Sequence, residues 1–136
     1  MISLTFFSTA VQDLTVGQLT QLLATCRSWN RKFDLTGMML YAGGHFVQTI
    51  EGPDEDVLAM YERIRHDPRH RDVFESLREP IAVRAFPDWS MGFDLVLDRQ
   101  LDSVPGFTDY LQADGRGGQV GGRAGVFHRV FRDNMR

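Results

Sequence analysis

The chain has 136 residues, of which 43% are hydrophobic and 24% are charged, and its formal net charge is −3. This length and composition suit one globular domain with a real core, and the acidic balance argues against a nucleic-acid partner, which needs a clustered basic face. The single cysteine, Cys26, excludes an intrachain disulfide and a cysteine metal cluster. No apolar run reaches the roughly 18 residues of a membrane span. We therefore expect a cytoplasmic protein with no membrane partner and no signal peptide, since a strand pattern begins at once.

The first predicted strand opens the chain with residues 2–10, ISLTFFSTA. Ile2, Leu4 and Phe6 fall on one face of this strand, and Phe7 falls on the other, because side chains alternate along an extended chain. The pattern therefore separates two neighbouring phenylalanines onto opposite faces of the sheet.

The first helix has a marked beginning, with Thr15 as N-cap and Gln18 three residues later, as in a capping box. Its apolar residues recur at helical spacing, and the pattern fades over residues 30–34. Two strands follow, at residues 34–41 and 45–51, joined by a tight Ala-Gly-Gly hairpin.

Pro53 and the three acidic residues after it predict the start of a second helix, which ends near Asp67-Pro68. Two further extended stretches follow, at residues 72–86, broken by Pro80, and at residues 89–97. The resulting order βαββαββ predicts an α+β fold, namely a ferredoxin-like sandwich with two helices packed on one face of a five-stranded mixed sheet.

The last part of the chain differs in composition from the rest. Residues 98–136 are predicted to form a C-terminal helical extension, in which residues 114–125 are a glycine-rich linker. The final stretch repeats an apolar pair at i, i+4, so it reads equally as a docking helix or as a frayed terminus. We therefore expect a domain at residues 1–97 followed by this extension.

Gln48 is the first residue that does not suit a plain core. It lies between Phe46 and Ile50 on one face of the predicted strand 45–51. An amide between two large apolar neighbours is buried and needs hydrogen-bond partners. That partner is either a backbone group or a ligand with a polar edge.

Other candidate residues each have an ordinary structural interpretation. Asn30 suits a helix C-terminus, and Arg63 and Asp67 are spaced as an i, i+4 surface ion pair. Trp89 and Met91 share one face of the last predicted strand, as core residues do. Together, however, these residues place polar groups around one apolar slot, which suits a flat heteroaromatic ligand with polar edges.

Motifs of catalysis are missing from the sequence. The histidines have no metal-binding spacing such as HExxH, and neither a GxSxG nor a Walker motif is present. The glycine-rich stretch near the C-terminus lies in no strand-to-helix context. We therefore expect no catalytic residues, no metal and no enzyme.

Four segments occur in the order and spacing of a known family: WNRKFDLTGMMLY, HFVQTIEGP, IRHDPRH and RAFPDWSMG. Over residues 1 to about 97 the chain resembles the BLUF domain, a flavin-binding blue-light sensor. The resemblance implies the fold predicted above and FAD or FMN as the cofactor. It also implies a signalling role in which a homo-oligomer or a separate partner protein receives the signal.

The resemblance carries over to individual positions. Asn30 matches the asparagine that bonds the pyrimidine edge of the flavin, and Gln48 matches the glutamine beside flavin N5 and O4. Arg63 and Asp67 match a polar pair near the isoalloxazine and ribityl groups. Trp29 departs from the family, which often has a polar residue at this position, so its ring could stack on the ligand or narrow the approach to it.

The signalling residues of the family also have counterparts. Trp89 and Met91 match the tryptophan and methionine that exchange burial and relay the signal through the last strand. Without an attached output domain, the signal would leave through this strand and the C-terminal segment.

The gravest departure concerns the photoactive tyrosine, whose position in the first strand is occupied by Phe6, two residues before Ser8. In the family mechanism this tyrosine gives an electron and a proton to the excited flavin, after which the glutamine rearranges. Phenylalanine has no hydroxyl with which to donate a proton or hold Gln48. Neither Tyr41 nor Tyr61 is expected near enough to substitute.

Three functions remain as hypotheses. The preferred one is a flavin-binding BLUF protein with an altered or absent photocycle, in which Trp89 could donate an electron instead. The second is a flavin-free interaction module on the same fold, with Trp29 and Phe6 filling the slot. The third is an acylphosphatase-type hydrolase, which the residues after the first strand disfavour because they lack an arginine and a phosphate loop.

Overall fold

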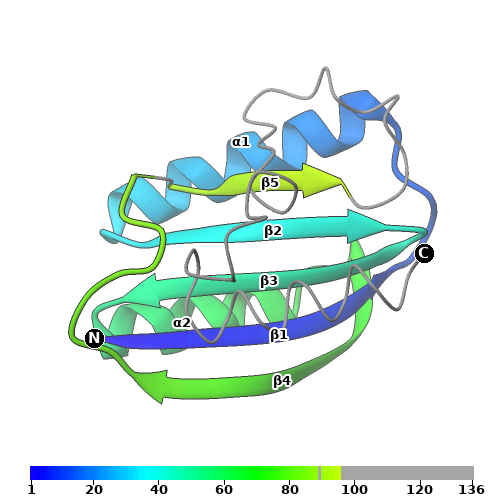
Figure 1. The fold of residues 1–136 in the computed structure, drawn as a ribbon. Helices are drawn as coiled ribbons and strands as arrows, with labels where there is room; N and C mark the ends of the chain where they lie inside the picture. Colours follow the sequence, from blue (N-terminus) through cyan, green and yellow to red (C-terminus); the bar gives the residue numbers. More distant parts are fainter. Residues whose placement is uncertain (89, 96–136) are drawn as a thin grey trace, which may run out of the picture.

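The computed structural model describes residues 1–88 and 90–95 (Figure 1). Within this part of the chain the elements are β1 (Ile2–Ala10), α1 (Val16–Lys32), β2 (Thr36–Ala42), β3 (His45–Gly52), α2 (Asp54–Arg65), β4 (His70–Pro80) and β5 (Gly92–Leu95). The α+β class and the two helices are confirmed. The predicted extension 98–136 with its linker 114–125 lies outside the described residues, as does Trp89.

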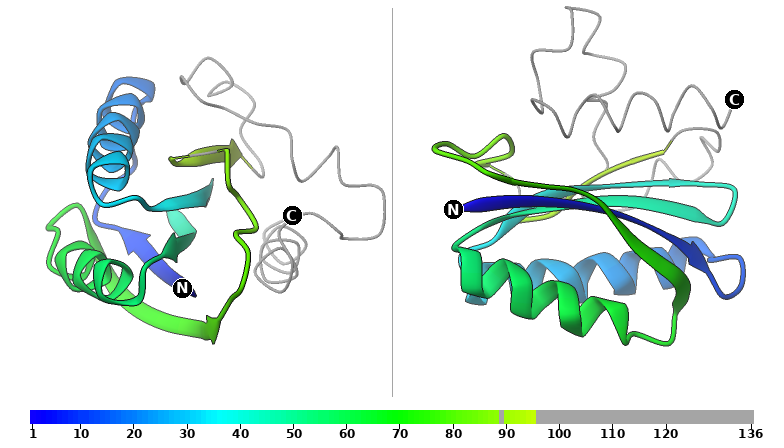
Figure 2. Two further views of the ribbon diagram at one scale, coloured as in Figure 1. Left: turned by 90° about the vertical axis from the view of Figure 1, so that its left-hand side faces the viewer. Right: turned by 90° about the horizontal axis from the view of Figure 1, so that it is seen from below.

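The strands form one sheet in the order β4-β1-β3-β2-β5. All neighbouring strands are antiparallel except β2 and β5, which run parallel. Both helices cover the same face of this sheet, so the fold has two layers (Figure 2). The apolar face of β1 and β3 therefore meets α1 and α2.

Helix α1 begins where the capping box places it. Thr15 accepts a hydrogen bond from the backbone N–H of Gln18, and the Gln18 side chain accepts one from the Thr15 N–H. This reciprocal pair satisfies two donors that the first helical turn leaves open. The helix ends at Lys32, within the predicted range, and Asp34 then adopts a positive φ of 56° that reverses the chain into β2.

Strands β2 and β3 are joined by a two-residue turn, since Ala42 pairs with His45. Gly43 and Gly44 both have positive φ, as such hairpins require. Further along the same pair of strands, a Cβ atom on Gly37 would lie 2.0 Å from the Thr49 carbonyl oxygen. Only glycine fits at this position, because the clash is with backbone that cannot move aside.

The last strand is shorter than predicted, because β5 begins only at Gly92. Met91 therefore lies directly before the strand rather than within it, with an exposed fraction of 2%. Between Pro80 and Met91 the described chain runs as an irregular connection.

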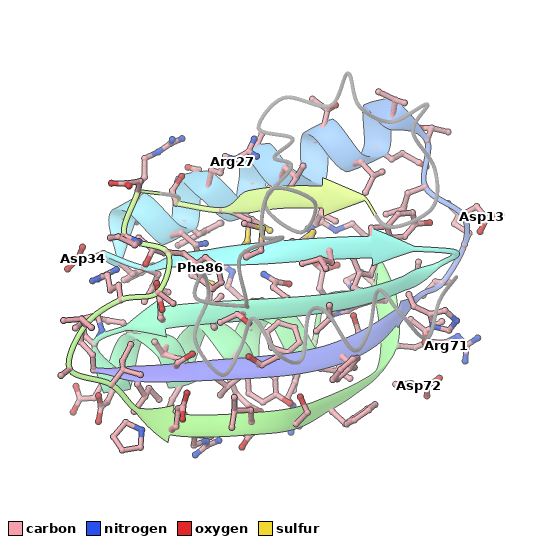
Figure 3. All side chains as sticks on the ribbon, viewed as in Figure 1. Asp13, Arg27, Asp34, Arg71, Asp72 and Phe86 are labelled. Carbon is pink, nitrogen blue, oxygen red and sulfur yellow. The ribbon has the colours of Figure 1, made fainter. Side chains whose placement is uncertain are left out.

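A buried carboxylate explains why this connection leaves the strand pattern. Glu51 on β3 is fully buried and accepts hydrogen bonds from the N–H groups of Ala85, at 2.9 Å, and Phe86, at 2.6 Å. The Thr36 hydroxyl donates to the same carboxylate at 3.0 Å. Backbone donors used in this way cannot join a sheet ladder, so Glu51 holds the connection to the sheet near Phe86 (Figure 3).

Candidate ligand-binding cavity

A cavity of about 170 Å³ lies between the two helices and the sheet. Its walls come from α1, α2, the central strands and the chain after α2. The lining residues are Leu14, Leu22, Thr25, Cys26, Trp29, Asn30, Met39, Phe46, Gln48, Met60, Arg63, Ile64, Asp67, Arg69 and His70. Four residues that the sequence predicts to bind a ligand, Asn30, Gln48, Arg63 and Asp67, are among those that line this cavity.

Gln48 faces the helices from β3, together with Phe46 and Ile50, as the alternation predicted. Its exposed fraction is 5%, and it lines the cavity. Among the described residues Gln48 has no amide atom that is both enclosed and unpartnered, so its amide is open to the cavity. A buried amide nearly always finds partners, so an amide left open at a cavity wall suits a ligand with a polar edge. This observation fits the residues to a flavin, whose pyrimidine ring offers such an edge.

Phe6 lies opposite Gln48 in the register between β1 and β3 and is fully buried. It is not among the residues that line the cavity, although it shares a face of the sheet with Gln48. Its ring packs against Tyr61 of α2, with ring centroids 5.1 Å apart. Tyr61 is therefore nearer to this position than predicted. Burial raises the pKa of Tyr61, and the Glu75 carboxylate adds to the rise.

Asn30 does not cap a helix end, because α1 continues to Lys32 and Phe33 is the C-cap. Its side chain is buried, and its amide nitrogen donates to the carbonyl oxygen of Ser90 at 2.5 Å. One turn earlier, Arg27 donates from Nε to the Met91 carbonyl at 2.9 Å. Figure 3 shows Arg27 on α1 beside β5. Helix α1 therefore holds the two residues that lead into β5.

The predicted ion pair between Arg63 and Asp67 is wrong. Asp67 instead accepts two hydrogen bonds from Nε of Arg69, one from its Nη2 at 2.6 Å and one from its backbone N–H. The hydrogen bonds from the Arg69 side chain are the main reason that the pKa of Asp67 lies below its usual range. Arg63 lies elsewhere, with its guanidinium carbon 3.5 Å from the ring centroid of Trp29.

Several lining residues were not singled out as ligand-binding candidates. Cys26 lies on α1 one turn before Asn30, and burial raises the pKa of its thiol to about 11. His70 bonds through Nδ1 with the Ser8 hydroxyl at 2.9 Å and donates from Nε2 to the Ile64 carbonyl at 2.6 Å. The i−4 spacing from Asn30 is the signal that could have found Cys26, since residues four apart share a helix face.

Two further features of the described residues concern metal binding and membrane insertion. The described residues contain no group of three or more side chains that could hold a metal ion. Neither described helix has the length and apolar character needed to span a bilayer.

The two-layer fold and the cavity with an amide open to it define a small α+β ligand-binding domain. Residues 1–92 match the BLUF family, described as sensors of blue-light using FAD, and the chain belongs to this family. The family is one of flavin-binding blue-light sensors with a signalling role.

Relatives of known function share this region. The chain is 37% identical over 110 residues to photoactivated adenylate cyclase subunit beta of Euglena longa, covering 80% of this chain and 13% of that protein. It is 34% identical over 98 residues to the blue light- and temperature-regulated antirepressor BluF of Escherichia coli, covering 71% of this chain and 24% of the relative. The chain thus spans about an eighth of the cyclase subunit and a quarter of the antirepressor.

Among solved structures, the dark state of BlrB, a BLUF protein, is similar over almost the whole chain. The TM-score is 0.70 and the sequence identity is 32%, with 98% of this chain and 96% of BlrB covered. The likeness to BlrB therefore extends over the fold of the described residues.

Proposed function

We propose that this protein is a BLUF-type flavin-binding signalling protein whose photocycle is altered or absent. The observation that carries the binding half of this proposal is the Gln48 amide, which belongs to a buried residue and is open to the cavity at its wall. The observation that carries the photochemical half is Phe6, which lies beside Gln48 in the sheet and has no hydroxyl.

Four side chains of the cavity wall would hold FAD or FMN. Asn30 keeps one amide N–H and its carbonyl oxygen for the pyrimidine edge, because a single N–H bonds Ser90. Gln48 offers both halves of its amide. Arg63 and Asp67 lie at the other helix, where they would meet the ring and the ribityl chain. A bound flavin supplies absorption of blue light and a ring that can accept an electron.

The residues around the cavity suggest how a rearrangement of the Gln48 side chain would be transmitted to the rest of the protein. We propose that Gln48, Met91 and Trp89 form the signalling route, with residues 1–97 as the sensor and 98–136 as the extension that continues it. Met91 is buried directly before β5, and its carbonyl is held by Arg27 of α1. The receiver of the signal is a second copy of this chain or a separate partner protein.

The absorption spectrum of the purified protein, recorded in the dark and after blue light, tests this proposal. We expect a yellow protein with stoichiometric flavin that lacks the reversible red shift of the family. A flavin-loaded protein with that red shift contradicts the assignment to Phe6. A colourless protein that refuses added FAD and FMN contradicts flavin binding and favours the interaction module.

Gln48→Leu is the matched variant for this experiment, because it keeps the volume of the side chain and removes the amide. We expect it to bind flavin more weakly than the wild type, since it removes the open amide. Equal affinity of the two proteins would show that Gln48 does not contact the flavin.

A further inference from the structure

Trp29 and Arg63 form a contact across the mouth of the cavity. Trp29 belongs to α1 and Arg63 to α2, and both line the cavity. The guanidinium carbon of Arg63 lies 3.5 Å from the centroid of the indole ring. This is the distance of a guanidinium stacked on an aromatic ring, which the negative face of the ring attracts. Because Arg63 is exposed and lines the cavity, the contact joins the two helices at the open side of the cavity, which is its mouth.

Arg63 has no carboxylate partner among the described residues. The acidic group one turn away, Asp67, is bonded to Arg69, and the adjacent Glu62 pairs with Arg65. The charge of Arg63 is therefore not neutralised by the nearest acids. Because its guanidinium lies flat on the indole, the N–H groups around its edge remain available as donors.

The same contact decides what Trp29 can do for a ligand. One face of the indole is occupied by Arg63 at van der Waals distance, so a flavin ring cannot stack there. The Phe33 ring lies parallel to the indole, with centroids 5.8 Å apart and an interplanar angle of 3°. Trp29 is therefore held in place by its neighbours, and it in turn restricts the long side chain of Arg63.

We propose that Trp29 is a positioning residue that holds the Arg63 guanidinium at the cavity mouth, where its edge donates hydrogen bonds to an oxygen of the bound flavin. This inference rests on the flavin binding of the proposed function. The accepting oxygen belongs to the flavin phosphate or to a carbonyl of its ring, and both are acceptors that a guanidinium edge recognises.

The test is a double-mutant cycle on the full chain, with dissociation constants for FMN measured by quenching of flavin fluorescence. We expect Trp29→Leu and Arg63→Gln each to weaken FMN binding by roughly 2- to 5-fold, the range of a cation–π contact at an exposed site. The double variant is expected to bind no more weakly than Arg63→Gln alone, because Trp29 acts through Arg63. Trp29→Phe keeps an aromatic face and is expected to retain most of the affinity.

Riboflavin distinguishes the two oxygens. If Arg63→Gln weakens FMN but leaves riboflavin unchanged, the phosphate is the acceptor. An equal loss for both flavins assigns the ring carbonyl. Either result supports the positioning role, whereas unchanged affinity for both flavins overturns it.

Lys32→Gln is the matched control, because Lys32 also lies over the indole, at 5.1 Å, but does not line the cavity. We expect this variant to bind FMN as the wild type does. A loss equal to that of Arg63→Gln would overturn the proposal in favour of general attraction by positive charge. Additive losses in the cycle would also overturn it, since Trp29 would then act independently of Arg63. Wild-type protein that binds neither flavin overturns the proposed function together with this inference.

Discussion

Replacing Phe6 with tyrosine adds one oxygen atom next to Gln48. The two residues lie directly opposite each other in β1 and β3, where Cβ atoms are about 4.5–5.5 Å apart. Phe6 is fully buried, so the new hydroxyl cannot reach solvent. The Gln48 amide lies on the same face of the sheet and is open to the cavity, and we expect it to accept a hydrogen bond from the new hydroxyl.

The magnitude follows from these two groups. A buried hydroxyl without a partner costs about 1–3 kcal/mol, and a hydrogen bond to a neutral amide contributes about 0.5–1.5 kcal/mol. Phe6→Tyr is therefore expected to change the free energy of unfolding by less than about 1 kcal/mol, because Gln48 offsets the cost. In a Gln48→Leu background the same change is expected to destabilise the protein by about 1–3 kcal/mol, because the hydroxyl is left unpaired.

Urea denaturation measures the free energy of unfolding of the wild type, Phe6→Tyr, Gln48→Leu and the double variant. Absorption spectra are recorded for the flavin-loaded forms. Phe6→Tyr is expected to show a reversible red shift after blue light, because a donor again lies beside Gln48. Phe7→Tyr is the matched control. Phe7 stacks on the exposed Phe74 on the other face of β1, so its hydroxyl lies away from the cavity and no red shift is expected.

Two results would refute this reasoning. If Phe6→Tyr costs as much in the presence of Gln48 as in its absence, the hydroxyl does not reach the amide. If flavin-loaded Phe6→Tyr folds normally but shows no red shift, the lack of a photocycle has another cause, such as Trp29 or the shape of the cavity.

Three further predictions concern residues around the site. With the pKa of Cys26 raised to about 11, about one thiol in a thousand is ionised at pH 8, so alkylation of Cys26 should be slow. The alkylation rate should rise about tenfold per pH unit up to pH 10 and should fall when flavin is added. A rate that levels off near pH 9 would contradict this prediction. Glu51→Gln places an amide N–H₂ against backbone donors and should lower the free energy of unfolding by about 2–4 kcal/mol in urea denaturation, and an unchanged midpoint would refute the anchoring role. Because its pKa is lowered on folding, the Asp67 carboxylate stabilises the folded state above the unfolded pKa of about 3.9, and this stabilisation is lost as pH falls through the folded pKa. The difference in free energy of unfolding between wild type and Asp67→Asn should therefore be constant above about pH 5 and shrink below about pH 4. A difference independent of pH would contradict this prediction.

Local patterns in the sequence were sufficient for the elements that depend on neighbouring residues. Thr15 and Gln18 predict the beginning of α1 because a capping box satisfies donors within one turn. The alternation around Gln48 predicts the face it occupies, because side chains alternate along any strand. The family motifs then bring Asn30 and Gln48 to one cavity, as the structure shows.

The partners of these side chains follow from packing between elements distant in sequence. The spacing of Arg63 and Asp67 favours an ion pair, yet Asp67 bonds Arg69 and Arg63 crosses to Trp29 on the other helix. The spacing of two residues in the sequence predicts only contacts within one helix. A planar guanidinium is stabilised more by an aromatic face that leaves its donors free than by an exposed carboxylate.

The sequence by itself thus determined the α+β class, the family and four residues of the cavity wall, because periodicity and motifs act over a few residues. Only the tertiary structure decided that Phe6 packs on Tyr61 behind the cavity, that Asn30 holds Ser90, and that Glu51 anchors the connection before β5. These contacts join residues 35 to 60 positions apart or come from helices packed on the sheet. Each contact forms because a polar group or an aromatic ring is buried when the helices pack on the sheet, and it then bonds or packs with the group that lies next to it.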